Sequence, residues 1–184
     1  MGIRSYLTNQ KMNKKIFAIV GYTNWGKSNT LYDLFDRKQF FPLKSPISTD
    51  YFKGKKFTVV NASNEDRPTE KYLDRLQSIL KKHEHEDTIF VITISVIFNA
   101  GTHAVNDVFN YLNSLESYEL HYLILVSGWY KNSTLKLEDT MRMEDNIKKG
   151  AIKYLPEIIN QSKQNFSGRT KKIASYVARC LQKI

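Results

Sequence analysis

One eight-residue segment of the sequence has the residue types and the spacing needed to bind a polyphosphate. Residues 21–28 read GYTNWGKS and fit the pattern G-x-x-x-x-G-K-[ST] at every fixed position. A bound phosphate chain must be surrounded by backbone N–H groups that point inward. Gly21 permits a sharp exit from a strand, and Gly26 lets the backbone approach the phosphates without a side-chain clash.

The polar side chains at the end of this segment suit the same ligand. Lys27 supplies a flexible positive charge to the β- and γ-phosphates, and Ser28 supplies a hydroxyl group for Mg²⁺. A helix that begins at Lys27 would direct its free N–H groups and the positive end of its dipole at the anion. The candidate binding residues are therefore Gly21, Thr23, Asn24, Trp25, Gly26, Lys27, Ser28 and Asn29.

The segment resembles the Walker A motif of the P-loop NTPase superfamily, on these eight residues and on a compatible order of strands and helices. The resemblance implies a P-loop NTPase fold, an α/β three-layer sandwich with a mainly parallel central sheet. It also implies Mg²⁺-dependent nucleotide binding, with hydrolysis or phosphoryl transfer. Neither [NT]-K-x-D nor D-x-x-G, the usual signatures of guanine nucleotide proteins, occurs in the sequence. ATP is therefore the expected nucleotide.

The sequence departs from the superfamily in its carboxylates. A second motif usually places Asp or Glu at the end of an apolar strand, where it holds Mg²⁺. Here the candidate strands end at Asn61, Ser95 and Ser127. We expect Asp66, shortly after the second strand, to be the substitute metal ligand and catalytic carboxylate beside Lys27. The alternative, that Asp66 belongs only to a turn before a helix, stays open, and so does binding without turnover.

Apolar runs and helical periodicities place the motif in a single α/β domain that spans residues 1–184, with 1–13 loosely ordered. Helices with apolar faces should alternate with buried strands, and such alternation favours a mainly parallel sheet. Residues 139–164 are expected to be partly helical, with a break at Pro156. The expected strands are 16–20, 57–60, 89–94 and 122–126, and the expected helices are 27–36, 69–83, 102–115 and one that follows Gly168.

The charge of the chain favours anionic partners. The formal net charge is +10, with 28 basic and 18 acidic residues, and the basic residues are concentrated in residues 1–60 and 131–184. Nucleic acid or an acidic protein are thus possible partners through the two basic ends. The longest apolar run, 89–98, is too short and too polar to span a bilayer. With no signal-peptide pattern near Met1, the expected location is cytoplasmic.

Three functions fit these observations. The first is an ATP-binding protein that hydrolyses the γ-phosphate slowly or when a partner stimulates it. The second is a small-molecule or nucleotide kinase, in which Asp50 or Asp66 would position an acceptor hydroxyl group. The third is a binding module in which nucleotide occupancy controls a contact with nucleic acid or protein. Trp25, and Trp129 with Tyr130 after the fourth strand, could stack on a base, although packing explains them as well.

Overall fold

In a computed structural model, the structure describes residues 14–99, 101–128, 133–156 and 163–182. Its described elements begin with the apolar run that precedes Gly21, and they alternate between strands and helices, as the sequence predicts. In chain order they are β1 (Lys14–Gly21), α1 (Lys27–Leu34), β2 (Ile47–Ser48), the short 3₁₀ helix η1 (Asp50–Phe52), β3 (Lys56–Val60), α2 (Thr69–Lys82), β4 (Ile89–Ser95), the 3₁₀ helix η2 (Gly101–His103), α3 (Asn106–Asn113), β5 (Tyr118–Leu125), α4 (Leu137–Asn146), β6 (Ala151–Leu155) and α5 (Lys163–Gln182).

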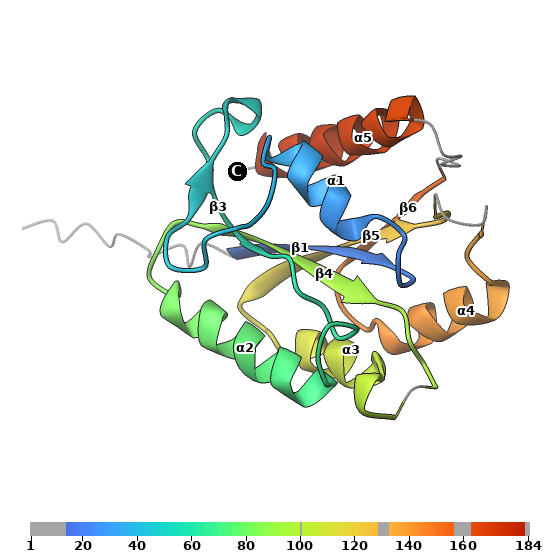
Figure 1. The fold of residues 1–184 in the computed structure, drawn as a ribbon. Coiled ribbons are helices and arrows are strands. Elements are labelled where there is room, and N and C mark those ends of the chain that lie inside the picture. Colours follow the sequence, from blue (N-terminus) through green and yellow to red (C-terminus); the bar gives the residue numbers. More distant parts are fainter. Residues whose placement is uncertain (1–13, 100, 129–132, 157–162, 183–184) are drawn as a thin grey trace, which may run out of the picture.

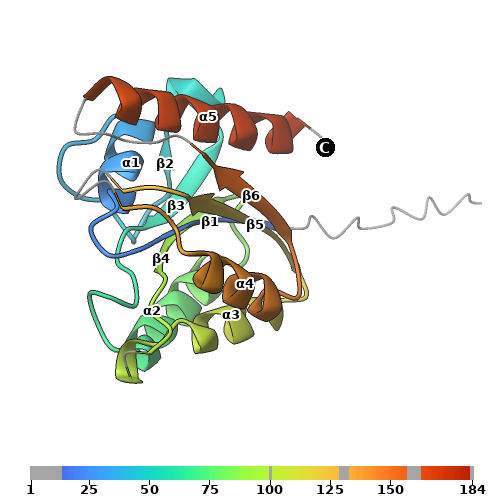
Figure 2. The same ribbon diagram turned by 90° about the vertical axis from the view of Figure 1, so that its right-hand side faces the viewer.

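Within the described ranges, six strands form one sheet in the order β2-β3-β4-β1-β5-β6. All neighbouring pairs are parallel except β2 with β3. Helices α1 and α5 cover one face of the sheet, and α2, α3 and α4 cover the other (Figures 1 and 2). The chain is therefore an α/β protein with a mostly parallel central sheet between two layers of helices.

Strand β1 lies in the middle of the sheet and is buried on both faces. Its alternate side chains contribute to two apolar clusters, with Ile16, Ala18 and Val20 facing α2 and α3, and Phe17 and Ile19 facing α1 and α5. Burial on both faces explains why the strand is apolar at every one of these positions rather than at alternate ones. This packing fixes the direction in which the chain leaves β1 at Gly21.

The chain leaves β1 and its neighbour β4 toward opposite faces of the sheet. After β1 it enters α1 on one face, whereas after β4 it continues to α3 on the other (Figure 1). Adjacent parallel strands with opposite exits leave a crevice at their carboxyl ends, where ligands of open α/β sheets bind. Gly21 at the end of β1 and Ser95 at the end of β4 are in register across this crevice.

The two-residue strand β2 was not expected, and α5 begins at Lys163 rather than after Gly168. Two further elements differ from the sequence prediction. Residues 151–155, expected in a partly helical region, form strand β6, because they pair with β5 at the edge of the sheet. Strand β5 begins at Tyr118 rather than at residue 122, because its more polar first four residues also pair with β1. Neither difference affects the crevice between β1 and β4.

Candidate functional site

The Gly21–Ser28 loop lies at the carboxyl end of β1 and leads directly into α1. Asn24 (φ 61°) and Gly26 (φ 77°) both adopt the left-handed conformation, which Gly and Asn tolerate best. Left-handed residues in a short loop let successive N–H groups point to one side, the arrangement that binds anions. Helix α1 begins without a side-chain cap hydrogen bond, so no side chain blocks the N–H groups of its first turn.

The side chain of Lys27 is buried, with only 4% of its surface exposed, and its ammonium group lies inside the loop. Its Nζ donates to the carbonyl oxygens of Tyr22 at 2.8 Å and Gly21 at 3.4 Å, and forms an ion pair with Glu65 Oε2 at 3.3 Å. Burial lowers the pKa of Lys27, while the charges of Glu65 and Asp66 oppose that shift. The ammonium group is thus held where a phosphate bound to the loop would meet it.

Glu65 comes from the segment after β3 and reaches across the end of β4. Ser95 Oγ, at the end of β4, donates a hydrogen bond of 2.5 Å to Glu65 Oε2. The segment is held there by Asn64, whose amide donates to the carbonyl of Ser95 at 3.0 Å and accepts from its N–H at 2.9 Å. A carboxylate therefore does lie at the tip of β4, supplied by the neighbouring loop rather than by the strand itself.

Asp66, the carboxylate that the sequence favoured, is exposed and turned back on its own segment. Its Oδ2 accepts hydrogen bonds from the backbone N–H of Ser63 at 2.7 Å and from Ser63 Oγ at 3.4 Å. Its charge acts on Lys27 from a distance, but the carboxylate paired with Lys27 is Glu65. The spacing of Ser63 and Asp66 could have predicted this orientation of Asp66. An acidic residue three positions after Ser often accepts a hydrogen bond from the backbone N–H of that Ser.

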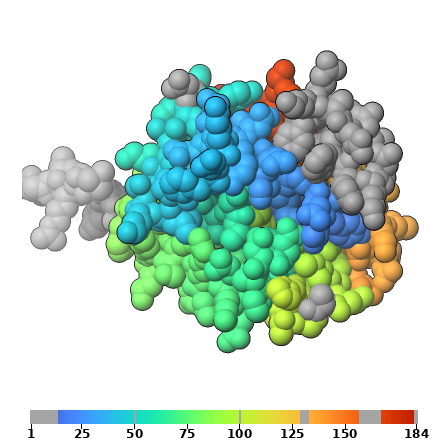
Figure 3. Space-filling view, in the orientation of Figure 1, coloured from blue at the N-terminus to red at the C-terminus, as the bar shows by residue number. Residues whose placement is uncertain are grey.

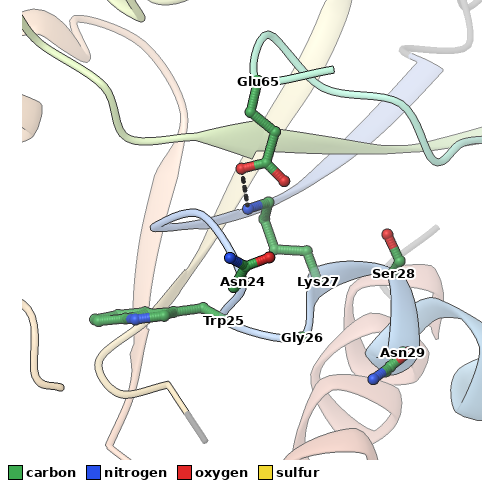
Figure 4. A pocket seen from close by; sticks show the side chains of 7 residues that line it. All are labelled: Asn24, Trp25, Gly26, Lys27, Ser28, Asn29 and Glu65. Carbon is green, nitrogen blue, oxygen red and sulfur yellow. Dashed lines mark hydrogen bonds and ion pairs between the residues drawn. The ribbon is translucent and has the colours of Figure 1, made fainter. Parts of the chain in front are cut away.

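A cavity of about 400 Å³ opens over the loop, within the size range of small-ligand pockets. Figure 4 shows Lys27 and Glu65 pointing toward one another across it, with Ser28 and Asn29 at the start of α1 on one side. Thr23 and Asn24 are exposed at the tip of the loop. The residues that line the cavity are Asn24, Trp25, Gly26, Lys27, Ser28, Asn29 and Glu65. In the space-filling view, the blue segment that includes the loop adjoins the green segment after β3 (Figure 3).

Trp25 lines the cavity at its edge, but its indole ring packs behind the loop, on the side away from Lys27 (Figure 4). Its indole ring points away from Lys27 and is 3% exposed (Figure 4). Its Nε1 donates to Ser133 Oγ at 2.8 Å, and its ring meets Tyr22 edge-on at 4.6 Å between centroids. A Cβ atom on Gly128 would lie 2.2 Å from Trp25 Cδ1, so only glycine fits there. These contacts favour packing over base stacking as the role of Trp25.

Arg169, near the start of α5, is completely buried and contacts the same loop. Its guanidinium donates to the carbonyl oxygen of Trp25 at 2.9 Å and to the carbonyl oxygen of Ser127 beyond β5. In a trans peptide the N–H points away from the preceding carbonyl, and no cis peptide occurs in the described residues. Arg169 therefore turns the N–H of Gly26 to the opposite side, away from α5. No sequence pattern indicated this contact, which joins residues 144 positions apart.

Other residues singled out in the sequence lie apart from the cavity or beyond what the structure describes. Trp129 and Tyr130 fall outside the described residues, and the side chain of Asp50 is not described either. The described part of the chain contains no group of three His, Cys, Asp or Glu side chains arranged to hold a metal ion. The lining residues with side-chain oxygens that could hold a cation include Ser28, with its hydroxyl group, and Glu65, with its carboxylate, beside the amides of Asn24 and Asn29.

Comparison with models of known protein families finds no match for this chain, and comparisons with curated proteins and with solved structures find none either. Among the described helices, none combines the length and apolar character needed to cross a bilayer. We therefore infer function from the geometry of the Gly21–Ser28 loop and its surroundings.

Proposed function

We propose that this protein binds a nucleoside triphosphate with Mg²⁺, and that the Gly21–Ser28 loop acts as a P-loop. The observation that carries the proposal is the position of Lys27, buried in a cavity at the start of an uncapped helix and surrounded by a loop with two left-handed residues. The crevice between β1 and β4 is also where ligands of parallel α/β sheets bind. ATP is the proposed nucleotide because guanine-recognition motifs are absent from the sequence.

The chain's own groups would bind the phosphates by replacing contacts that they make with each other. Lys27 now donates to the carbonyls of Gly21 and Tyr22, and the phosphate oxygens of a ligand would accept from it more strongly because they are charged. The N–H groups from Asn24 to Ser28 would surround the β-phosphate. Arg169 would keep the N–H of Gly26 directed away from α5, toward the ligand.

The donor set at the cavity fits Mg²⁺. This ion is usually held in nucleotide sites by one or two protein oxygens, with phosphates and water completing its shell, so a cluster of three acidic residues is not required. Ser28 and Glu65 are the two residues that would hold it, and the ion would neutralise charge on the phosphates. Ser95, which donates to Glu65, would keep that carboxylate oriented toward the cavity.

We propose slow or partner-stimulated hydrolysis as the reaction, in which water attacks the γ-phosphate and releases ADP and inorganic phosphate. The protein would act by position and charge, with Lys27 stabilising the charge that develops on the transferred group. Among the described residues, Glu65 is the carboxylate that forms an ion pair with Lys27, and it is therefore the candidate base. A slow intrinsic rate follows, because the same carboxylate would then hold the metal.

Isothermal titration calorimetry of ATP, GTP and their diphosphates, with Mg²⁺ present, tests the binding proposal. We expect ATP and ADP to bind, and Lys27→Ala to weaken ATP binding by about a hundredfold, since charged hydrogen bonds contribute about 1.5–3 kcal/mol each. Lys55→Ala, which removes an exposed lysine before β3, is the matched control and should bind normally. Absence of heat with all four nucleotides on the folded protein would refute the proposal.

A further inference from the structure

The carboxylate of Glu65 lies in the cavity as an internal anion that faces Lys27. Its Oε2 atom is 3.3 Å from Lys27 Nζ, and both residues line the cavity over the Gly21–Ser28 loop (Figure 4). Ser95 Oγ donates a hydrogen bond of 2.5 Å to the same oxygen. The positive charge that a phosphate would meet in this loop therefore already has an anionic partner from the chain itself.

The backbone next to Glu65 is fixed to the end of β4, so this carboxylate is positioned by the fold. Asn64 is completely buried, and its amide both donates to the carbonyl oxygen of Ser95 at 3.0 Å and accepts from the N–H of Ser95 at 2.9 Å. The same amide donates to the carbonyl oxygen of His103 at 2.8 Å. The side chain of Glu65 is itself only 24% exposed. A ligand at Lys27 would therefore meet the charge of Glu65 at close range.

That charge should have opposite effects on two forms of a nucleotide. A phosphate beside Lys27 would bring negative oxygens next to Glu65, and like charges repel strongly where little water screens them. A divalent cation between the carboxylate and the phosphate reverses this effect, because both groups then become its ligands. Ser28, which lines the same cavity, offers a further oxygen to such a cation.

We propose that Glu65 makes the site selective for a nucleotide that carries a divalent cation, and that it excludes the metal-free nucleotide. This inference rests on the proposed nucleotide binding and specifies the form of the ligand that the cavity accepts. Binding of the two ligands is then coupled reciprocally. Glu65 makes the cation strengthen nucleotide binding, and the nucleotide must strengthen binding of the cation by the same factor.

Calorimetric titration of ADP into the full chain, once with saturating Mg²⁺ and once with EDTA, tests the selectivity. In the wild type we expect Mg²⁺ to strengthen ADP binding by about a hundredfold, with repulsion and metal ligation each contributing about tenfold. Glu65→Gln keeps the size of the side chain and an oxygen that can accept from Ser95. We expect this variant to bind metal-free ADP about tenfold more tightly than the wild type, and ADP with Mg²⁺ about tenfold more weakly.

Asp66→Asn is the matched control, because it removes the same charge at the next position. Asp66 is exposed and accepts from the backbone N–H of Ser63 at 2.7 Å, outside the set of residues that line the cavity. We expect this variant to change either affinity by less than about threefold. Glu65→Ala, which removes the charge without adding an amide, should reproduce the pattern of Glu65→Gln. Thermal melting of each variant identifies a folding defect.

The opposite signs of the two changes distinguish charge selection from a structural role, which would weaken both forms of binding. Weaker binding of metal-free ADP to both Glu65 variants would overturn the proposal, and so would equal changes in Glu65→Gln and Asp66→Asn. If the wild type binds ADP with Mg²⁺ but shows no preference for the metal, only the selectivity is refuted. If it binds ADP under neither condition, the proposed nucleotide binding is refuted as well.

Discussion

At the residue scale, Glu65 and Asp66 are neighbours in sequence, yet their carboxylates have different surroundings. Glu65 accepts from Ser95 and pairs with Lys27, whereas Asp66 accepts from the backbone N–H of Ser63. The difference arises because the Ser63–Asp66 turn directs the Asp66 side chain to its own backbone, whereas the preceding side chain, Glu65, points to the end of β4. The position of Glu65 beside Lys27 makes it the carboxylate that would meet a metal ion bound to the triphosphate.

This assignment predicts unequal effects of neutralising the two carboxylates. We expect Glu65→Gln to raise the Mg²⁺ concentration needed for half-maximal ATP hydrolysis by about tenfold or more, because an ionised ligand is lost. Asp66→Asn should mainly cost stability, by about 1 kcal/mol, through its bond to Ser63. A Mg²⁺ titration of phosphate release measures both. The reverse ranking would return the metal role to Asp66, as the sequence indicated.

At the element scale, the Gly21–Ser28 loop is held from behind by β5 and α5. Trp25 packs against Gly128, and Arg169 of α5 binds the carbonyl of Trp25. The side of the loop that would face the phosphates is therefore oriented by the packing of the other side of the loop against β5 and α5. A change that moves the indole ring should move the N–H groups of the loop as well.

Gly128→Ala tests this dependence. The added Cβ would lie 2.2 Å from Trp25, so the ring must shift. Overpacking of this kind costs about 1–3 kcal/mol, and we expect a melting temperature lower by several degrees together with weaker ADP binding. Gly168→Ala is the control: no atom lies within 4 Å of its Cβ, and Ala in a helix is favoured over Gly by about 1 kcal/mol. Unchanged nucleotide affinity in a destabilised Gly128→Ala would contradict the link.

A second element contact, between β5 and α5, should make stability depend on pH. His121 is nearly buried, stacks on Phe17, and bonds Glu119 Oε1 at 2.9 Å and Tyr176 OH at 3.1 Å. Burial lowers the pKa of His121, opposed by Glu119, while Lys15 lowers it further. As the pH falls through about 6.5, His121 therefore binds a proton more readily in the unfolded chain than in the folded chain.

We therefore expect the free energy of unfolding to fall as the pH decreases from about 7 to 5.5, and to be insensitive to His121 above that range. Urea denaturation at several pH values measures the slope. The His121→Gln variant should be less stable than the wild type at pH 7.5. Its free energy of unfolding should, however, fall less than that of the wild type between pH 7 and 5.5. Glu119, whose pKa is lowered, contributes to pH dependence only in more acidic solution. Equal slopes in both proteins would exclude His121 as the titrating group.

Much of the element order could be predicted from the sequence, because the central strands are buried on both faces. Runs such as Ile16–Val20 and Ile89–Ile94 contain too little polarity for anything but an internal strand. Strand β6, Ala151–Leu155, was missed because it lies at the edge and is largely half-exposed. Its Lys153 and Tyr154 carry no periodic signal, and pairing with β5 decides its conformation.

The candidate site was predicted only where its chemistry is local. The Gly21–Ser28 pattern identified the loop, since the glycine and lysine positions are set by contacts within eight residues. Glu65 and Arg169 reach the loop through long-range contacts, separated in sequence by 38 positions from Lys27 and 144 from Trp25. Hydrophobic periodicity contains no information about which polar residue meets another across the sheet, so these assignments needed the fold.

At the scale of the whole molecule, the polar groups that would bind a nucleotide converge from distant parts of the chain on one end of the sheet. The loop after β1, the segment after β3 and the tip of β4 meet there, and α5 supports them from the other side. The crevice between β1 and β4 arises because the chain leaves these two parallel strands toward opposite faces of the sheet. Ligand binding should therefore stabilise the domain as a unit and not only the loop.

This coupling predicts a thermal shift that depends on Lys27. A ligand at a hundred times its Kd stabilises the folded state by about 2.7 kcal/mol. In a domain of 184 residues, that corresponds to a rise in melting temperature of about 5–10 °C. We expect such a rise with ADP and Mg²⁺ in the wild type and in Lys55→Ala, and little or none in Lys27→Ala at the same concentrations. An equal rise in Lys27→Ala would mean that the nucleotide stabilises the protein from somewhere else.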